Sequence, residues 1–156
     1  MRRAALVFFA LVATVLVSLS TGSPALADFS PVDWFEGADG FERAVEEARS
    51  GNKPLLVYFR TDWCPYCRQF EDSLLASEEV EIYLDKLVRV TINPEAGREE
   101  AQLASAYGVR GYPALFLHPP GPAEPRTIRR TTSQNGQLRL QTPVEFVQTL
   151  ARAAHE

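Results

Sequence analysis

The sequence predicts a single α/β domain in which helices flank a mixed central β-sheet. The 156 residues, 46% hydrophobic and 23% charged, fit one globular domain and are too apolar for a disordered chain. Short apolar runs alternate with helical patterns over most of the chain, and two segments resembling antiparallel strands follow. The net charge of −4 disfavours a nucleic-acid backbone as partner.

The first half of the domain is predicted to run helix, strand, helix, helix, strand. An Asp39–Glu42 capping box opens a helix that ends near Gly51, and an unbroken apolar run at 54–59 indicates a buried central strand. After the segment 60–67, a helical pattern places Phe70, Leu74 and Leu75 on one face. Ser77 caps a further helical piece over 77–84, and the β-branched run 87–92 predicts a strand.

The second half is predicted to run helix, strand, two antiparallel or edge strands, helix. Residues 98–107 form a helix that stops at Gly108, and 114–117 form an apolar strand followed by a proline-rich turn at 119–122. Segments 127–130 and 138–140 alternate like edge strands around a turn at Asn135-Gly136. A capping box at Thr142 and Glu145 opens the last helix, and its predicted apolar face is Val144, Val147, Leu150 and Ala151.

Residues 1–27 are predicted to be a secretory signal peptide, which leaves residues 28–156 as the folded domain. Arg2 and Arg3 form a basic start, residues 4–17 an uncharged apolar run, and Ala25-Leu26-Ala27 a cleavage site. An uncleaved membrane anchor is the alternative, although the dense apolar part is shorter than the roughly 20 residues that a span needs.

The two cysteines, Cys64 and Cys67, lie where a predicted central strand gives way to a helix. A structural disulfide is one interpretation, but so short a loop constrains the unfolded chain little. At a helix N-terminus the pKa of Cys64 should fall, which makes it the attacking sulfur, while Cys67 lies one turn inward and resolves the mixed disulfide. Zinc would need His118 and His155 as further ligands, and two thiolates alone leave Cu(I) open.

Three stretches resemble the thioredoxin family in its exported bacterial form: Lys-Pro-Leu-Leu-Val-Tyr-Phe at 53–59, Trp-Cys-Pro-Tyr-Cys at 63–67, and residues 106–117. The resemblance implies a thioredoxin-like fold and a redox-active Cys64–Cys67 disulfide that needs no other cofactor. It also implies a cis bond before Pro113 that faces the sulfurs, with Tyr112 and Trp63 helping to bind the substrate.

One departure from that family concerns the proton acceptor of the second cysteine. Thioredoxins usually carry a buried Asp six residues before the first Cys, and here that position is Tyr58. Glu71 and Asp62 are the candidate replacements, with surface carboxylates as the alternative interpretation. A second departure, the Pro-Tyr dipeptide at 65–66, resembles glutaredoxin.

The resemblance implies an exported thiol:disulfide oxidoreductase, located in the periplasm or secreted, that reduces protein disulfides as a monomer. A membrane electron-donor protein would recharge it, because the sequence holds no NADPH or flavin motif. We expect no bound metal and no nucleic-acid partner. The alternatives are a dithiol oxidase, or a copper- or peptide-binding thioredoxin-like module without turnover.

Overall fold

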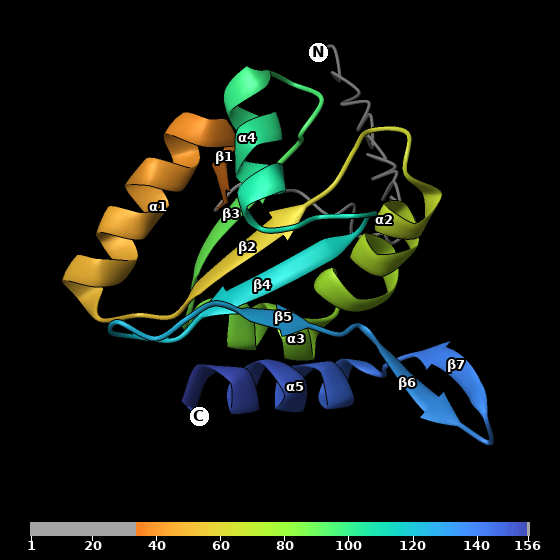
Figure 1. The fold of residues 1–156 in the computed structure, drawn as a ribbon. Coiled ribbons are helices and arrows are strands. Elements are labelled where there is room, and N and C mark those ends of the chain that lie inside the picture. Colours follow the sequence, from red (N-terminus) through yellow and green to blue (C-terminus); the bar gives the residue numbers. More distant parts are fainter. Residues whose placement is uncertain (1–33, 156) are drawn as a thin grey trace, which may run out of the picture.

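The computed structural model describes residues 34–155, and the predicted signal peptide lies outside this range. The predicted fold class is confirmed, with a five-stranded mixed sheet between two layers of helices (Figure 1). The sheet has the order β1-β3-β2-β4-β5, with bounds Phe35–Glu36, Val88–Ile92, Leu55–Phe59, Ala114–His118 and Arg126–Ile128. Strands β1, β3 and β2 are parallel, and β4 and β5 continue the sheet antiparallel.

Helices α1 (Gly37–Gly51) and α4 (Arg98–Ala106) cover one face of the sheet, and α3 (Glu78–Leu84) and α5 (Pro143–His155) cover the other (Figure 1). Helix α2 (Pro65–Phe70) follows β2 and continues directly into a π-helical turn, η1 (Glu71–Leu75). Within the described residues, no helix is both long and apolar enough to cross a membrane.

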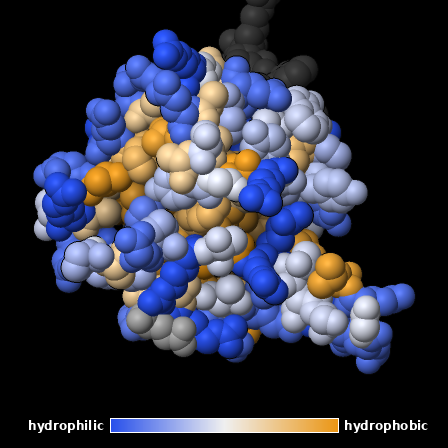
Figure 2. All heavy atoms as spheres, viewed as in Figure 1, coloured by the Kyte–Doolittle hydropathy of each residue, from blue (hydrophilic) through white to orange (hydrophobic). Residues whose placement is uncertain are grey.

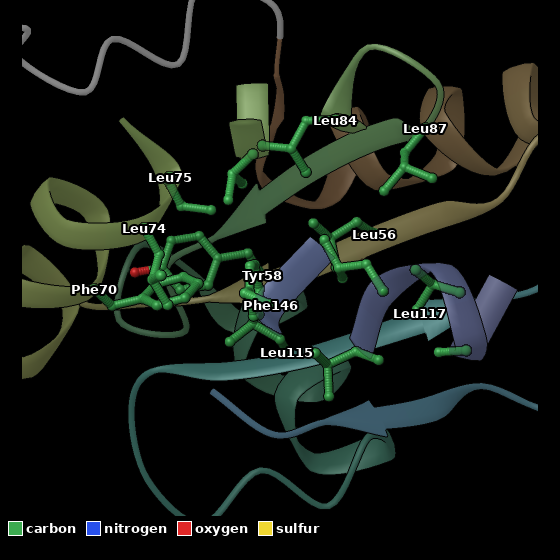
Figure 3. Close-up of a cluster of buried hydrophobic side chains, with 14 of the residues drawn as sticks. Leu56, Tyr58, Phe70, Leu74, Leu75, Leu84, Leu87, Leu115, Leu117 and Phe146 are labelled. Carbon is green, nitrogen blue, oxygen red and sulfur yellow. The ribbon is translucent and has the colours of Figure 1, made fainter. Parts of the chain in front are cut away.

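Strand β2 is buried along its whole length because it lies in the middle of the sheet. Alternate residues point to opposite faces, so β2 supplies both hydrophobic cores. Leu55, Val57 and Phe59 pack under α1 and α4. Leu56 and Tyr58 pack against the helices of the other face, in the cluster drawn in Figure 3.

One predicted helix cap is wrong, and a second is at the predicted residue but makes no side-chain cap hydrogen bond. Helix α1 begins at Gly37, with Glu36 at the N-cap and no side-chain cap. Asp39 therefore lies inside the first turn, where its negative charge interacts favourably with the positive end of the helix dipole. Ser77 is the N-cap of α3, but its hydroxyl donates to the carbonyl of Leu74 in the preceding turn.

The predicted apolar face of the last helix is wrong in part. Val144 is 55% exposed, and the residues of α5 that are buried are Phe146, Leu150, Ala153 and Ala154. These positions share a helix face at spacings of four, three and one. Figure 3 shows Phe146 beside Tyr58 and Leu115, between the helix and the sheet.

Only the first half of the strand predicted over 127–130 is a strand in the structure, because residues 129–130 lie between β5 (Arg126–Ile128) and the next strand. Strand β5 pairs with β4 at the edge of the main sheet. A separate hairpin follows, β6 (Thr131–Gln134) and β7 (Gln137–Leu140), joined by the predicted turn. Asn135 and Gly136 both have positive φ, 52° and 78°, as a two-residue hairpin loop of the primed type requires. The hairpin projects from the body of the molecule (Figure 1).

The predicted capping box at the start of α5 is confirmed. The amide of Thr142 donates to the Glu145 carboxylate at 2.8 Å, and the amide of Glu145 donates to the Thr142 hydroxyl at 3.3 Å. Arg139 of β7 donates to both oxygens of the same carboxylate, at 2.6 and 2.7 Å. This hydrogen-bonded pair lowers the pKa of Glu145 to about 2, so the carboxylate stays charged and ties the hairpin to the helix.

Replacing Thr142 by alanine is expected to lower the free energy of unfolding by about 1 kcal/mol, because one amide of the first turn loses its acceptor. Urea denaturation followed by circular dichroism measures the change. Ser133→Ala on the exposed part of β6 is the control, for which a change within about 0.5 kcal/mol is expected. Equal destabilisation by both changes would show that the cap contributes nothing specific.

Candidate active site

Cys64 and Cys67 form a disulfide at the N-terminus of α2, with their Cα atoms 5.2 Å apart. Cys64 is the N-cap residue, and Pro65 follows in the first turn of the helix. Proline has no backbone N–H, but the amides of the first turn have no partner within the helix, so no helix hydrogen bond is lost. The amide of Cys67 donates to the sulfur of Cys64 at 3.1 Å. The N-terminus of α2 thus places one backbone amide donor at the first sulfur, and such a donor favours a thiolate over a thiol.

Both cysteines are nearly inaccessible in this disulfide form. Cys64 retains 2% of its accessible surface and Cys67 none. The exposure lies instead on the flanking rings, since Trp63 is 62% and Tyr66 64% exposed. Two exposed aromatic side chains therefore lie within two residues of Cys64 in the sequence.

Trp63 is held by a residue that sequence reasoning missed. Its indole N–H donates to both carboxylate oxygens of Glu95, at 2.9 and 3.1 Å. The amide of Glu95 in turn donates to the side chain of Asn93 at 3.0 Å. The available signal was the Asn-Pro-Glu loop directly after β3, because β3 and β2 are parallel neighbours and end at the same edge of the sheet.

The segment before β4 also reaches this edge. The rings of Tyr112 and Trp63 meet edge to face with centroids 6.4 Å apart. The Tyr112–Pro113 peptide bond is cis, and Pro113 is buried. Arg130, a second residue that sequence reasoning missed, donates to the Pro113 carbonyl at 3.3 Å from the segment between β5 and β6.

At the start of η1, a buried carboxylate contacts β2. The hydroxyl of Tyr58 donates to Glu71 at 2.8 Å, and Arg60 forms an ion pair with the same oxygen at 2.7 Å. Glu71 is only 6% exposed. Burial, together with the negative charge of Glu71, raises the pKa of Tyr58 well above its ordinary value of 10.0, so the phenol stays protonated and remains a donor.

The comparisons with known proteins agree with this geometry. A family model described as thioredoxin-like matches residues 34–120. The chain belongs to the thioredoxin-like family. Its disulfide-bonded Cys-x-x-Cys pair and its fold agree with that family, and they confirm the predicted class, a thioredoxin-like thiol:disulfide oxidoreductase.

The names of several curated relatives refer to thioredoxin or to disulfide chemistry. The chain is 35% identical over 107 residues to the thioredoxin-like protein HCF164 of Arabidopsis thaliana, covering 68% of this chain and 37% of the relative. It is 31% identical over 90 residues to the thiol:disulfide interchange protein DsbD 1 of Pseudomonas aeruginosa, covering 56% and 15%. It is 29% identical over 89 residues to the disulfide bond reductase DsbH of Chlamydia pneumoniae, covering 51% and 54%.

Solved structures share the fold. A thioredoxin from Thermus thermophilus superposes with a TM-score of 0.58 at 20% identity, over 77% of this chain and 86% of that one. The C-terminal domain of DsbD from Neisseria meningitidis in its oxidised form superposes with a TM-score of 0.56 at 19% identity, over 77% and 98%.

The two carboxylates considered as proton acceptors lie in different surroundings in this thioredoxin-like protein. The Asp62 side chain is 81% exposed and lies near Arg60 and Asn93, each with a nitrogen 3.4 Å from one of its oxygens. Glu71, by contrast, is enclosed between the strand and the helix that carries both cysteines. Within residues 34–155, no cluster of three or more His, Cys, Asp or Glu side chains could hold a metal ion.

Proposed function

We propose that this thioredoxin-like protein is an exported, monomeric reductase of protein disulfides. The observation that carries the proposal is the Cys64–Cys67 disulfide at the N-terminus of α2, with a backbone amide donating to the sulfur of Cys64. The relative DsbH is named a disulfide bond reductase, which supports reduction as the direction of the proposed reaction.

In the proposed reaction, the Cys64 thiolate attacks one sulfur of a substrate disulfide and releases the other substrate sulfur as a thiolate. Cys67 then loses its proton and attacks the Cys64 sulfur of the mixed disulfide. This step forms the Cys64–Cys67 disulfide and releases the second substrate thiolate, so two electrons pass from protein to substrate. A membrane electron-donor protein with its own dithiol would reverse these steps and restore the reduced pair.

The exposed rings of Trp63 and Tyr66 support binding of a protein substrate, because large amphipathic rings are enriched at protein interfaces. Tyr112 and Pro113 border Trp63 through the Tyr112 ring and complete the proposed substrate surface. An extended substrate segment would pair with the backbone of this loop.

Glu71 is the carboxylate that we propose as proton acceptor for Cys67. It lies four residues after Cys67, within the same continuous helical segment, and it is buried where Asp62 is exposed. Tyr58 and Arg60 hold one of its oxygens, which leaves the second oxygen for a proton.

Two assays test the proposal. Reduction of insulin disulfides by dithiothreitol should accelerate in the presence of the protein, whereas a copper- or peptide-binding module would leave the rate unchanged. Equilibration with glutathione should give a reduction potential between the roughly −270 mV of thioredoxin and the roughly −200 mV limit of glutaredoxins. A value near the roughly −120 mV of DsbA would favour the dithiol oxidase instead.

The proposal of export rests only on the signal-peptide pattern of residues 1–27. Intact-mass measurement of the protein recovered from a bacterial periplasm should give a chain that begins at Asp28. A membrane-bound product that retains Met1 would favour the anchor.

A further inference from the structure

The segment around the β6–β7 hairpin carries the opposite charge from the rest of the chain. Residues 125–144 hold four arginines and no Asp or Glu, in a protein whose net charge is −4. Three of these arginines have internal roles: Arg126 donates to the carbonyl of Ala153, Arg130 to that of Pro113, and Arg139 to Glu145.

The fourth, Arg129, is exposed and so is Arg152 of α5. Within the part of the chain that the structure describes, neither guanidinium has a hydrogen-bond or ion-pair partner. Both line a shallow groove of about 470 Å³ between the hairpin and α5, which is also lined by Thr131, Thr132, Ser133 and Gln141. Two free cations, hydroxyl groups and an amide are donors suited to carboxylates.

An exposed apolar side chain lies at the same groove. Leu138 of β7 lines it and is 78% exposed, the highest exposure among the large hydrophobic residues of the described chain. Figure 2 shows a small hydrophobic patch on the projecting hairpin, surrounded by hydrophilic surface. The combination favours a peptide with both acidic and apolar residues over a free inorganic anion, which has no use for an apolar contact.

Arg130, the residue next to Arg129 of the groove, links the groove to the redox site by hydrogen bonding. Arg130 follows Arg129 directly and donates to the Pro113 carbonyl, and Tyr112 contacts Trp63 beside Cys64. A partner segment bound in the groove would therefore lie on the side of the molecule that carries Tyr112 and Pro113, the segment before β4. The net negative charge elsewhere would repel a nucleic acid or an anionic membrane.

We propose that this groove docks an acidic, leucine-containing segment of the protein with which the site exchanges disulfides. The inference rests on the proposed function for the identity of the partner, but not for binding itself. Carboxylates of the segment pair with Arg129 and Arg152, and an apolar side chain packs on Leu138. Such rim charges act mainly on the association rate and are screened by salt.

The test is fluorescence anisotropy with a rhodamine-labelled peptide of alternating Glu and Leu, added to the oxidised protein at low salt. The peptide should bind, and a peptide with Lys in place of Glu should not. Reversing both charges, Arg129→Glu with Arg152→Glu, should weaken binding at least about tenfold, because each reversal turns an attraction into a repulsion. Neutralising them, Arg129→Gln with Arg152→Gln, should give a smaller loss, and high salt should abolish the differences.

The matched control is Arg49→Glu with Arg98→Glu, two exposed arginines on α1 and α4 that make the same change in net charge away from the hairpin. This variant should bind the acidic peptide as the unaltered protein does. The proposal would be overturned by equal losses in both double variants or by equal binding of the Lys peptide. It would also be overturned by binding only to vesicles of an anionic phospholipid. Reduction of the uncharged hydroxyethyl disulfide by the unaltered protein tests the proposed function separately, so the two failures are distinguishable.

Discussion

Cys64→Ser is expected to reduce insulin-disulfide reduction to the uncatalysed rate, whereas Cys67→Ser is expected to trap partner proteins in covalent complexes. Cys64 caps α2 and receives the amide of Cys67, so its thiolate is the stabilised one. Cys67 has no accessible surface, so it is placed to attack the neighbouring Cys64 sulfur and not an external disulfide. Without Cys67 nothing resolves the mixed disulfide, and non-reducing gel electrophoresis followed by mass spectrometry would detect the trapped partner.

The control for this asymmetry is alkylation of the reduced variants by iodoacetamide near neutral pH. Cys67→Ser should keep rapid labelling at Cys64, and Cys64→Ser should lose it. If Cys64→Ser instead labels rapidly at Cys67 and accumulates the complexes, the roles of the two sulfurs are reversed.

Glu71→Gln is expected to slow the resolving step by about a hundredfold, the low end of what a positioned proton acceptor contributes. The glutamine keeps the volume and an oxygen for the Tyr58 hydroxyl but cannot accept a proton from Cys67. Stopped-flow decay of a preformed mixed disulfide measures the step directly. Because the hydroxide concentration rises with pH, the deficit should shrink towards alkaline pH, whereas a purely structural defect would persist.

Two neighbouring carboxylates provide matched controls. Asp72→Asn removes the exposed charge next to Glu71, and Asp62→Asn removes the other candidate acceptor. Both should leave the resolving rate within about twofold of the unaltered protein. A large effect of Asp62→Asn with none from Glu71→Gln would move the proton route to the surface.

Local patterns predicted most of the fold, because each depends on residues close in sequence. The apolar run of β2, the Gly108 stop after α4, the Asn135-Gly136 turn and the Thr142 capping box all match the structure. The start of α1 is a local error, because the helix begins at Gly37 and not after an Asp39 cap. The other errors are long-range ones. Phe146 rather than Val144 faces the core because α5 meets β4 and α3, and the sequence of α5 alone does not show which face they cover.

The same distinction separates the site residues. The cysteine pair is a local motif and was predicted, whereas Glu95 and Arg130 reach the site from loops 32 and 17 residues away from their contacts. Glu71 was proposed from helix spacing alone. Its contact with Tyr58 pairs a helix residue with a strand residue and depended on how α2 and η1 lie on the sheet.

The Tyr58–Glu71 hydrogen bond affects how related sequences should be compared. In this chain an acid group reaches the neighbourhood of β2 from the opposing helical segment, while the strand position itself holds a phenol. A comparison made one position at a time would record a phenol at 58 and a glutamate at 71 as unrelated features. A comparison of the two positions as a facing pair would record one buried carboxylate, supplied by the helical segment and held by the strand.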